Sequence, residues 1–94
     1  MSYRGIIEIY IELKEDLDNK TIKEIKEAVD ELLEGLDFEY ANNIISGGGL
    51  HNSLHGDKEL EMEDFKEKYG KYIKNGVIEF VYCDVPTTTV IFGD

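Results

Sequence analysis

The sequence has one cysteine, one proline and no tryptophan, and no apolar stretch approaches the ~20 residues of a membrane-spanning helix. The single thiol, Cys83, excludes an intramolecular disulfide and favours a reducing compartment. It has no CxxC motif and no neighbouring histidine, so we expect a small residue within a strand rather than a nucleophile. The amino terminus also lacks the uninterrupted apolar stretch of a signal peptide. We therefore expect a soluble, cytoplasmic protein.

Basic residues are scarce as well. Ten lysines and arginines stand against 21 aspartates and glutamates, which gives a formal net charge of −11 at pH 7. Contacts with nucleic-acid phosphates or anionic lipids need clustered lysine and arginine, so direct binding to nucleic acid or to a membrane is disfavoured. The charge instead favours a cationic partner such as a basic protein surface. A plainer interpretation stays open, in which the carboxylates only solvate the surface.

Ninety-four residues suffice for one domain and are too few for two, so residues 1–94 are predicted to form a single acidic domain. Apolar and polar residues alternate over residues 7–14, which predicts a strand open to water on one face. Spacings of three and four residues predict helices over residues 22–36 and 61–74, the first capped by Thr21 or Asp18. Further strands are predicted over residues 38–45, 77–83 and 87–92, with a turn between the last two.

Residues 46–57, SGGGLHNSLHGD, show no periodicity. They are interpreted as a flexible hairpin tip, with a short third strand near residues 50–54 as the alternative. The order β-α-β-(β)-α-β-β matches an α+β fold, a ferredoxin-like two-layer sandwich (βαββαβ) with an extra C-terminal strand.

Acidic residues gather at the end of the first predicted helix, where the helix dipole already places partial negative charge. Because this arrangement lacks a local structural reason, we interpret it as a partner-binding patch. A second acidic group stands at the start of the second predicted helix, where the dipole favours it. The predicted partner-binding residues are Asp30, Glu31, Glu34, Asp37, Glu61, Glu63 and Asp64.

Two other chemistries have candidate residues. His51 and His55 stand four apart with Asp57 close behind, and imidazole and carboxylate groups are ligands for zinc or another borderline cation. No HExxH motif accompanies them, and no cofactor is predicted apart from this divalent-metal alternative. Tyr10, Tyr40 and Tyr82 could meet on a sheet and stack on RNA bases, but no basic residues surround them.

None of these patterns predicts catalytic residues or an enzyme. The leading hypothesis is a small acidic protein-binding module that occupies a basic groove on a nucleic-acid-binding protein. By charge and size alone it is comparable to inhibitors from phages and mobile elements, such as anti-CRISPR proteins and DNA mimics. The alternatives are a metal- or small-ligand-binding protein that uses the Gly/His segment, and a structural homo-oligomer, such as a homodimer, that pairs open sheets or edge strands.

Overall fold

The computed structural model describes residues 2–82 and 87–93, and strand β1 (Ser2–Leu13) lies at the centre of its sheet. The predicted alternation in this strand is confirmed. Ile7, Ile9 and Ile11 are at most 3% exposed, whereas Glu8 and Tyr10 between them are exposed. One face of β1 therefore contributes to the core, and the other meets solvent.

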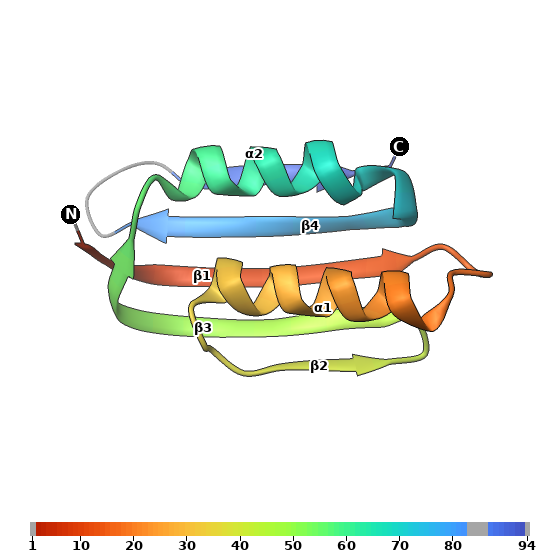
Figure 1. Ribbon diagram of the computed structural model, residues 1–94. Coiled ribbons are helices and arrows are strands. Elements are labelled where there is room, and N and C mark those ends of the chain that lie inside the picture. The colour runs from red at the N-terminus through yellow and green to blue at the C-terminus, as the bar shows by residue number, and fades with distance from the viewer. Residues whose placement is uncertain (1, 83–86, 94) are drawn as a thin grey trace.

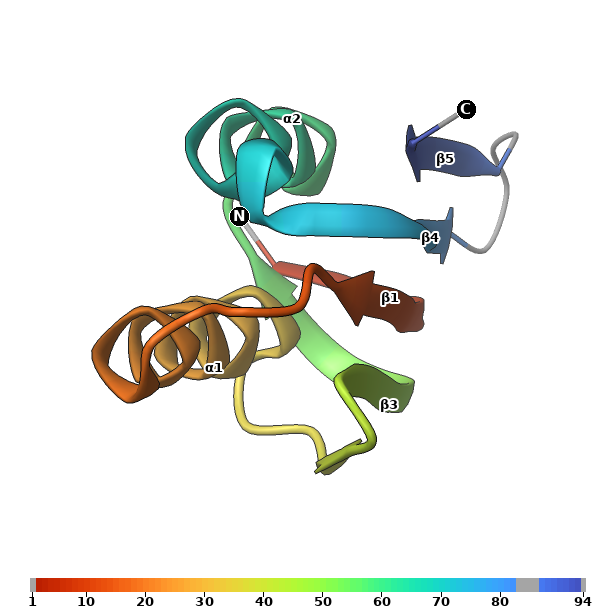
Figure 2. The same cartoon turned by 90° about the vertical axis from the view of Figure 1, so that its right-hand side faces the viewer.

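Five strands form one antiparallel sheet in the order β2-β3-β1-β4-β5. The four strands beside β1 are β2 (Phe38–Ala41), β3 (Ile44–His55), β4 (Ile73–Tyr82) and β5 (Thr88–Phe92). Helices α1 (Asn19–Leu33) and α2 (Lys58–Tyr69) both lie on one side of this sheet (Figure 1, Figure 2). The predicted two-layer α+β architecture is confirmed, and no described helix or strand covers the other side of the sheet.

Residues 38–45, predicted as one strand, instead form β2 and the start of β3. Asn42 and Asn43 join them with positive φ values of 53° and 65°. A type I′ turn requires this conformation at both central residues, and asparagine tolerates it better than most side chains. The poor strand preference of these two asparagines therefore marks the turn of a hairpin.

The interpretation of residues 46–57 as a flexible tip is wrong, because β3 runs without interruption to His55 and pairs with β1 on one side and β2 on the other. A Cβ atom at Gly47 would collide with the backbone of Phe38, and one at Gly48 with the carbonyl of Ile7. Gly48 also has a φ of +111°. The glycines that erase the alternation pattern therefore allow β3 to lie close to its two neighbours.

Helix α1 begins earlier than the apolar spacing predicts, because Asp18 and not Thr21 is its N-cap. The Asp18 carboxylate accepts a hydrogen bond from the Thr21 N–H at 2.8 Å, and bonds from the side chain and backbone of Thr21 lower the pKa of Asp18. The helix ends at Leu33 and is followed by Glu34, its C-cap, and Gly35, which both have positive φ. Such a left-handed residue is the usual end of a helix.

Helix α2 also begins earlier than predicted, at Lys58, and it ends earlier, at Tyr69. A short 3-10 helix (Gly70–Tyr72) follows it, and β4 then begins at Ile73 instead of after Gly76. Ile73 contributes a buried side chain to the core from the strand, not from the helix. The predictions made for Cys83 and for a turn at residues 84–86 lie outside the described residues.

The core lies between the sheet and the two helices. Ile25, Val29 and Leu33 of α1, with Met62 and Phe65 of α2, are buried against the inner face of the sheet. No helix in the described part of the chain is long and apolar enough to span a membrane.

Candidate protein-binding surface

The seven carboxylates predicted to bind a partner lie on the helical layer or next to it. The two helices run antiparallel, so the last turn of α1 lies near the first turn of α2 (Figure 1). Four of these residues belong to α1 and its exit, namely Asp30, Glu31, Glu34 and Asp37, and three to α2, namely Glu61, Glu63 and Asp64.

A groove of about 230 Å³ between the helices brings three of these carboxylates together. It is lined by Ala28, Glu31, Leu32, Glu61, Asp64, Phe65, Lys68 and Tyr69. Lys68 is the one basic residue in this lining, against the carboxylates of Glu31, Glu61 and Asp64. Leu32 and Phe65 in this lining are buried, whereas Glu31 and Asp64 are exposed, so the groove is chemically suited to a basic side chain with an apolar stem.

The remaining predicted residues do not line this groove. Asp30 belongs to a neighbouring hollow of about 440 Å³ beside α1, which Glu31 also lines. Glu63 and Asp37 are exposed and line neither of these two hollows. Glu31 therefore connects the two hollows, and the seven predicted carboxylates do not gather at a single site.

Lys58 occupies the place where α1 and α2 meet, and it is the one buried charged residue among those described, at 2% exposure. Its Nζ atom donates to the Leu32 carbonyl at 3.2 Å and lies 2.6 Å from Glu34 Oε2 and 3.1 Å from Glu61 Oε1. A buried ammonium group is tolerated only with such partners. Sequence reasoning missed Lys58, although its i,i+3 spacing to Glu61 was a usable signal.

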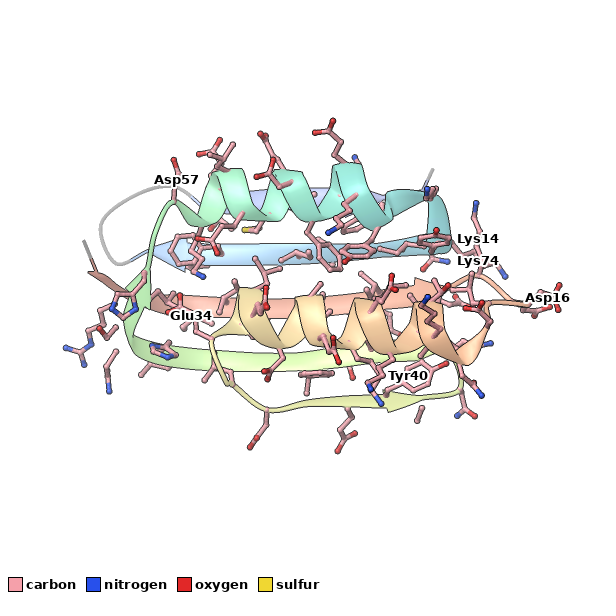
Figure 3. The ribbon with its side chains drawn as sticks, in the orientation of Figure 1. Lys14, Asp16, Glu34, Tyr40, Asp57 and Lys74 are labelled. Carbon is pink, nitrogen blue, oxygen red and sulfur yellow. The ribbon has the colours of Figure 1, made fainter. Side chains whose placement is uncertain are left out.

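Glu34 links three elements through one carboxylate (Figure 3). Besides Lys58, it accepts a hydrogen bond from the His55 backbone N–H at 2.8 Å and lies 3.0 Å from His55 Nδ1. Burial acts to raise the pKa of Glu34, but the hydrogen bonds from Lys58 and His55 outweigh it and lower the pKa to about 2. The carboxylate therefore stays ionised near neutral pH and is engaged within the fold.

The three residues predicted to bind a metal are each engaged separately. His51 Nδ1 accepts from the Ser53 N–H at 2.9 Å, His55 contacts Glu34, and Asp57 caps α2 by accepting from the Leu60 N–H at 3.1 Å. Within residues 2–82 and 87–93, no group of three or more histidine, cysteine, aspartate or glutamate side chains is arranged to hold a metal ion.

The tyrosines considered for base stacking do not share a face of the sheet. Tyr10 is exposed on the open face, whereas Tyr40 packs against the core on the helical side. The Nζ atom of Lys26 lies 5.5 Å from the centre of the Tyr40 ring. The side chain of Tyr82 lies outside the described part of the structure.

No protein-family model matches the sequence, and no curated protein and no solved structure is significantly similar to it.

Proposed function

We propose that this protein is a small acidic protein-binding module whose groove between α1 and α2 accepts a basic surface of another protein. One observation carries the proposal: Glu31 of α1 and Asp64 of α2, distant in sequence, line the same groove together with Glu61. Both helices pack buried side chains into the core, so their positions are fixed and the carboxylates lie on a rigid layer.

Electrostatics supports a cationic partner. Carboxylates placed side by side repel one another, and the lysines and arginines of a docked partner relieve that repulsion. A net charge of −11 also attracts a basic protein at long range, which speeds the encounter and makes it sensitive to salt.

The partner class we propose is a nucleic-acid-binding protein, with this module as its inhibitor. The basic groove of such a protein is built to hold rows of phosphates. Carboxylates fixed along two helices could take the place of those phosphates. Within this proposal Asp30, Glu31 and Asp64 contact the partner, Asp37 and Glu63 lie at the rim, and Glu34 maintains the geometry of the helix ends.

We also propose a ferredoxin-like assignment for residues 2–82, with β5 as an added edge strand. The order β2-β3-β1-β4 within the sheet supports it, because α1 connects β1 to β2 and α2 connects β3 to β4. This fold hosts many unrelated functions, so the assignment does not determine the function.

The test compares charge-reversed variants in affinity capture from nuclease-treated lysate at low and high salt. We expect wild type to retain basic nucleic-acid-binding proteins, which added duplex DNA or RNA then displaces. The double variant Glu31→Lys/Asp64→Lys should lose these proteins, because two attractive contacts become repulsive.

A matched control keeps the same net charge with the groove intact. Glu15 and Glu39 are exposed and do not line the groove, so Glu15→Lys/Glu39→Lys should still retain the partner. If both double variants retain the same proteins as wild type, or both lose them equally, the groove is not the binding surface and the proposal fails.

A further inference from the structure

The open side of the sheet, opposite the helices, carries most of the exposed large apolar side chains of the described residues. These are Ile6, Tyr10, Leu50, Val81 and Ile91, between 38% and 61% exposed. The remaining one, Leu60, lies on α2. Figure 2 shows both helices on the other side of the sheet. Apolar residues scattered singly need no explanation, but this set is gathered on one face.

Three consecutive rows of paired residues cross this face of the sheet. Leu50, Ile6 and Val81 lie opposite one another in the first row, and Glu39, Ser46, Tyr10, Val77 and Ile91 in the third. The row between them consists of Gly48, Glu8, Glu79 and Thr89. Two largely apolar rows therefore enclose a pair of carboxylates.

Glu8 and Glu79 are Cα partners on adjacent antiparallel strands, and both are exposed. Like charges directly opposite in a sheet destabilise it, and the other members of their row, Gly48 and Thr89, carry no charge. This repulsive pair of carboxylates lies between the exposed apolar side chains of the open face. Replacing either glutamate by threonine or lysine would be expected to stabilise the sheet.

A hollow of about 380 Å³ opens beside this pair. Glu8, Tyr10, Val77 and Glu79 line it together with the backbone of Gly47 and Gly48. A planar guanidinium group can bond two carboxylates at once and stack on an aromatic ring, whereas an ammonium group lacks that geometry. The lining therefore suits arginine better than lysine.

We propose that this open face docks a second kind of protein surface, one with an arginine at the centre of an apolar patch. The arginine bonds Glu8 and Glu79 beside Tyr10, and the apolar groups around it cover the two outer rows. Charge disfavours a second copy of this chain as the occupant, because stacking two such faces would bring four carboxylates together. This surface lies on the opposite side of the sheet from the helical groove, so the proposal stands or fails independently of the one above.

The test is an NMR titration of the full chain with short blocked peptides. The probe Val-Thr-Arg-Thr-Val places its valines four residues apart, the same separation as Ile6 and Tyr10. We expect saturable shifts of backbone amides around Glu8, Gly48 and Glu79, and no shifts in the helical groove. The peptide Val-Thr-Gln-Thr-Val lacks the cation, and the peptide Ser-Thr-Arg-Thr-Ser lacks the apolar flanks. We expect each to bind at least about tenfold more weakly than the probe.

The variant Glu79→Lys separates loss of binding from loss of folding. Its lysine faces Glu8, so its thermal midpoint should be at least that of wild type while the peptide-induced shifts disappear. The matched variant Glu24→Lys, exposed on α1 across the sheet from this face, should keep them. The proposal is overturned if Glu79→Lys binds like wild type, if the glutamine peptide binds as well as the arginine peptide, or if the same amides shift with protein concentration alone.

Discussion

Glu34 is the residue on which the junction of α1, β3 and α2 depends. Replacing it by glutamine removes the charge that faces the buried ammonium of Lys58, which then keeps only Glu61 and the Leu32 carbonyl. Removing one partner of a buried ion pair costs about 3 to 5 kcal/mol, and the remaining partners place Glu34→Gln near the lower end. Urea unfolding followed by circular dichroism measures this loss.

The matched variant is Glu31→Gln, on the exposed side of the same helix turn, which should change stability by no more than ~0.5 kcal/mol. The pH dependence gives an independent check. The pKa of Glu34 falls from 4.5 to about 2 on folding, so its contribution is fully present above pH 4.5 and is lost as the pH falls toward 2. Glu34→Gln should flatten the stability curve in that window, and an unchanged curve would contradict the role given to Glu34.

Sequence reasoning at this scale identified Glu34 as unusual and predicted a contact with an external partner, and it did not predict the contacts of this carboxylate within the fold. It located the carboxylate at the unfavourable end of a helix dipole, which is where the structure has it. The compensation comes from Lys58 and His55, which are distant in sequence. No local pattern predicts that contact, because it depends on the left-handed conformation of Glu34 and on the antiparallel packing of α2.

Strand β3 requires glycine for two reasons, a positive φ and close approach to its neighbours. Two adjacent positions allow these reasons to be tested separately. Gly49 has a φ of +146° but open space around the position of a Cβ, whereas Gly48 combines positive φ with a clash against Ile7 and Glu8. Gly49→Ala should therefore cost about 1 to 2 kcal/mol from backbone strain alone. Gly48→Ala should cost clearly more, because β1 or β3 must move.

Urea unfolding of the two variants gives the free energies, and amide hydrogen exchange shows where the strand opens. We expect faster exchange along β3 and its β1 partners in Gly48→Ala, with α1 less affected. Equal destabilisation by the two substitutions would mean that close approach to β1 is not what requires glycine at position 48.

The elements that sequence predicts well are those whose side chains alternate or recur. Strand β1 and the apolar faces of the helices follow directly from such spacing, as Ile9 and Val29 illustrate. Strand β3 has no comparable pattern, because glycine carries no polarity signal and the same residues are typical of loops. Glycine is required in β3 because the strand lies close to β1 and β2, and this closeness is seen only once the sheet is assembled.

For the molecule as a whole, the two faces of the fold present negative charge in different settings. On the helical side, Glu31 and Asp64 line a groove between rigid helices, and on the open side Glu8 and Glu79 stand among apolar side chains. Composition predicts the total charge but not this division, because the division depends on which side of the sheet the helices cover. A partner on one side leaves the other accessible, so the chain could join two proteins.

The net charge of −11 should make the folded state more stable in salt. The molecule measures 40 × 26 × 19 Å, and the Debye length falls from about 30 Å at ~0.01 M to about 8 Å at ~0.15 M ionic strength. Repulsion between carboxylates on opposite sides is therefore screened over this range, whereas the buried contact between Lys58 and Glu34 is screened much less. We expect the urea midpoint to rise with NaCl or KCl at an unchanged m value, which corresponds to a gain in unfolding free energy on the order of 1 kcal/mol.

The variant Glu31→Lys/Asp64→Lys has four fewer units of negative charge, so salt should stabilise it less than wild type. A urea midpoint that falls with salt would instead mean that attractive ion pairs outweigh the repulsion between carboxylates. The charges of the helical groove and the open face would then be balanced by pairs within the fold, which would contradict the proposal that they bind a partner.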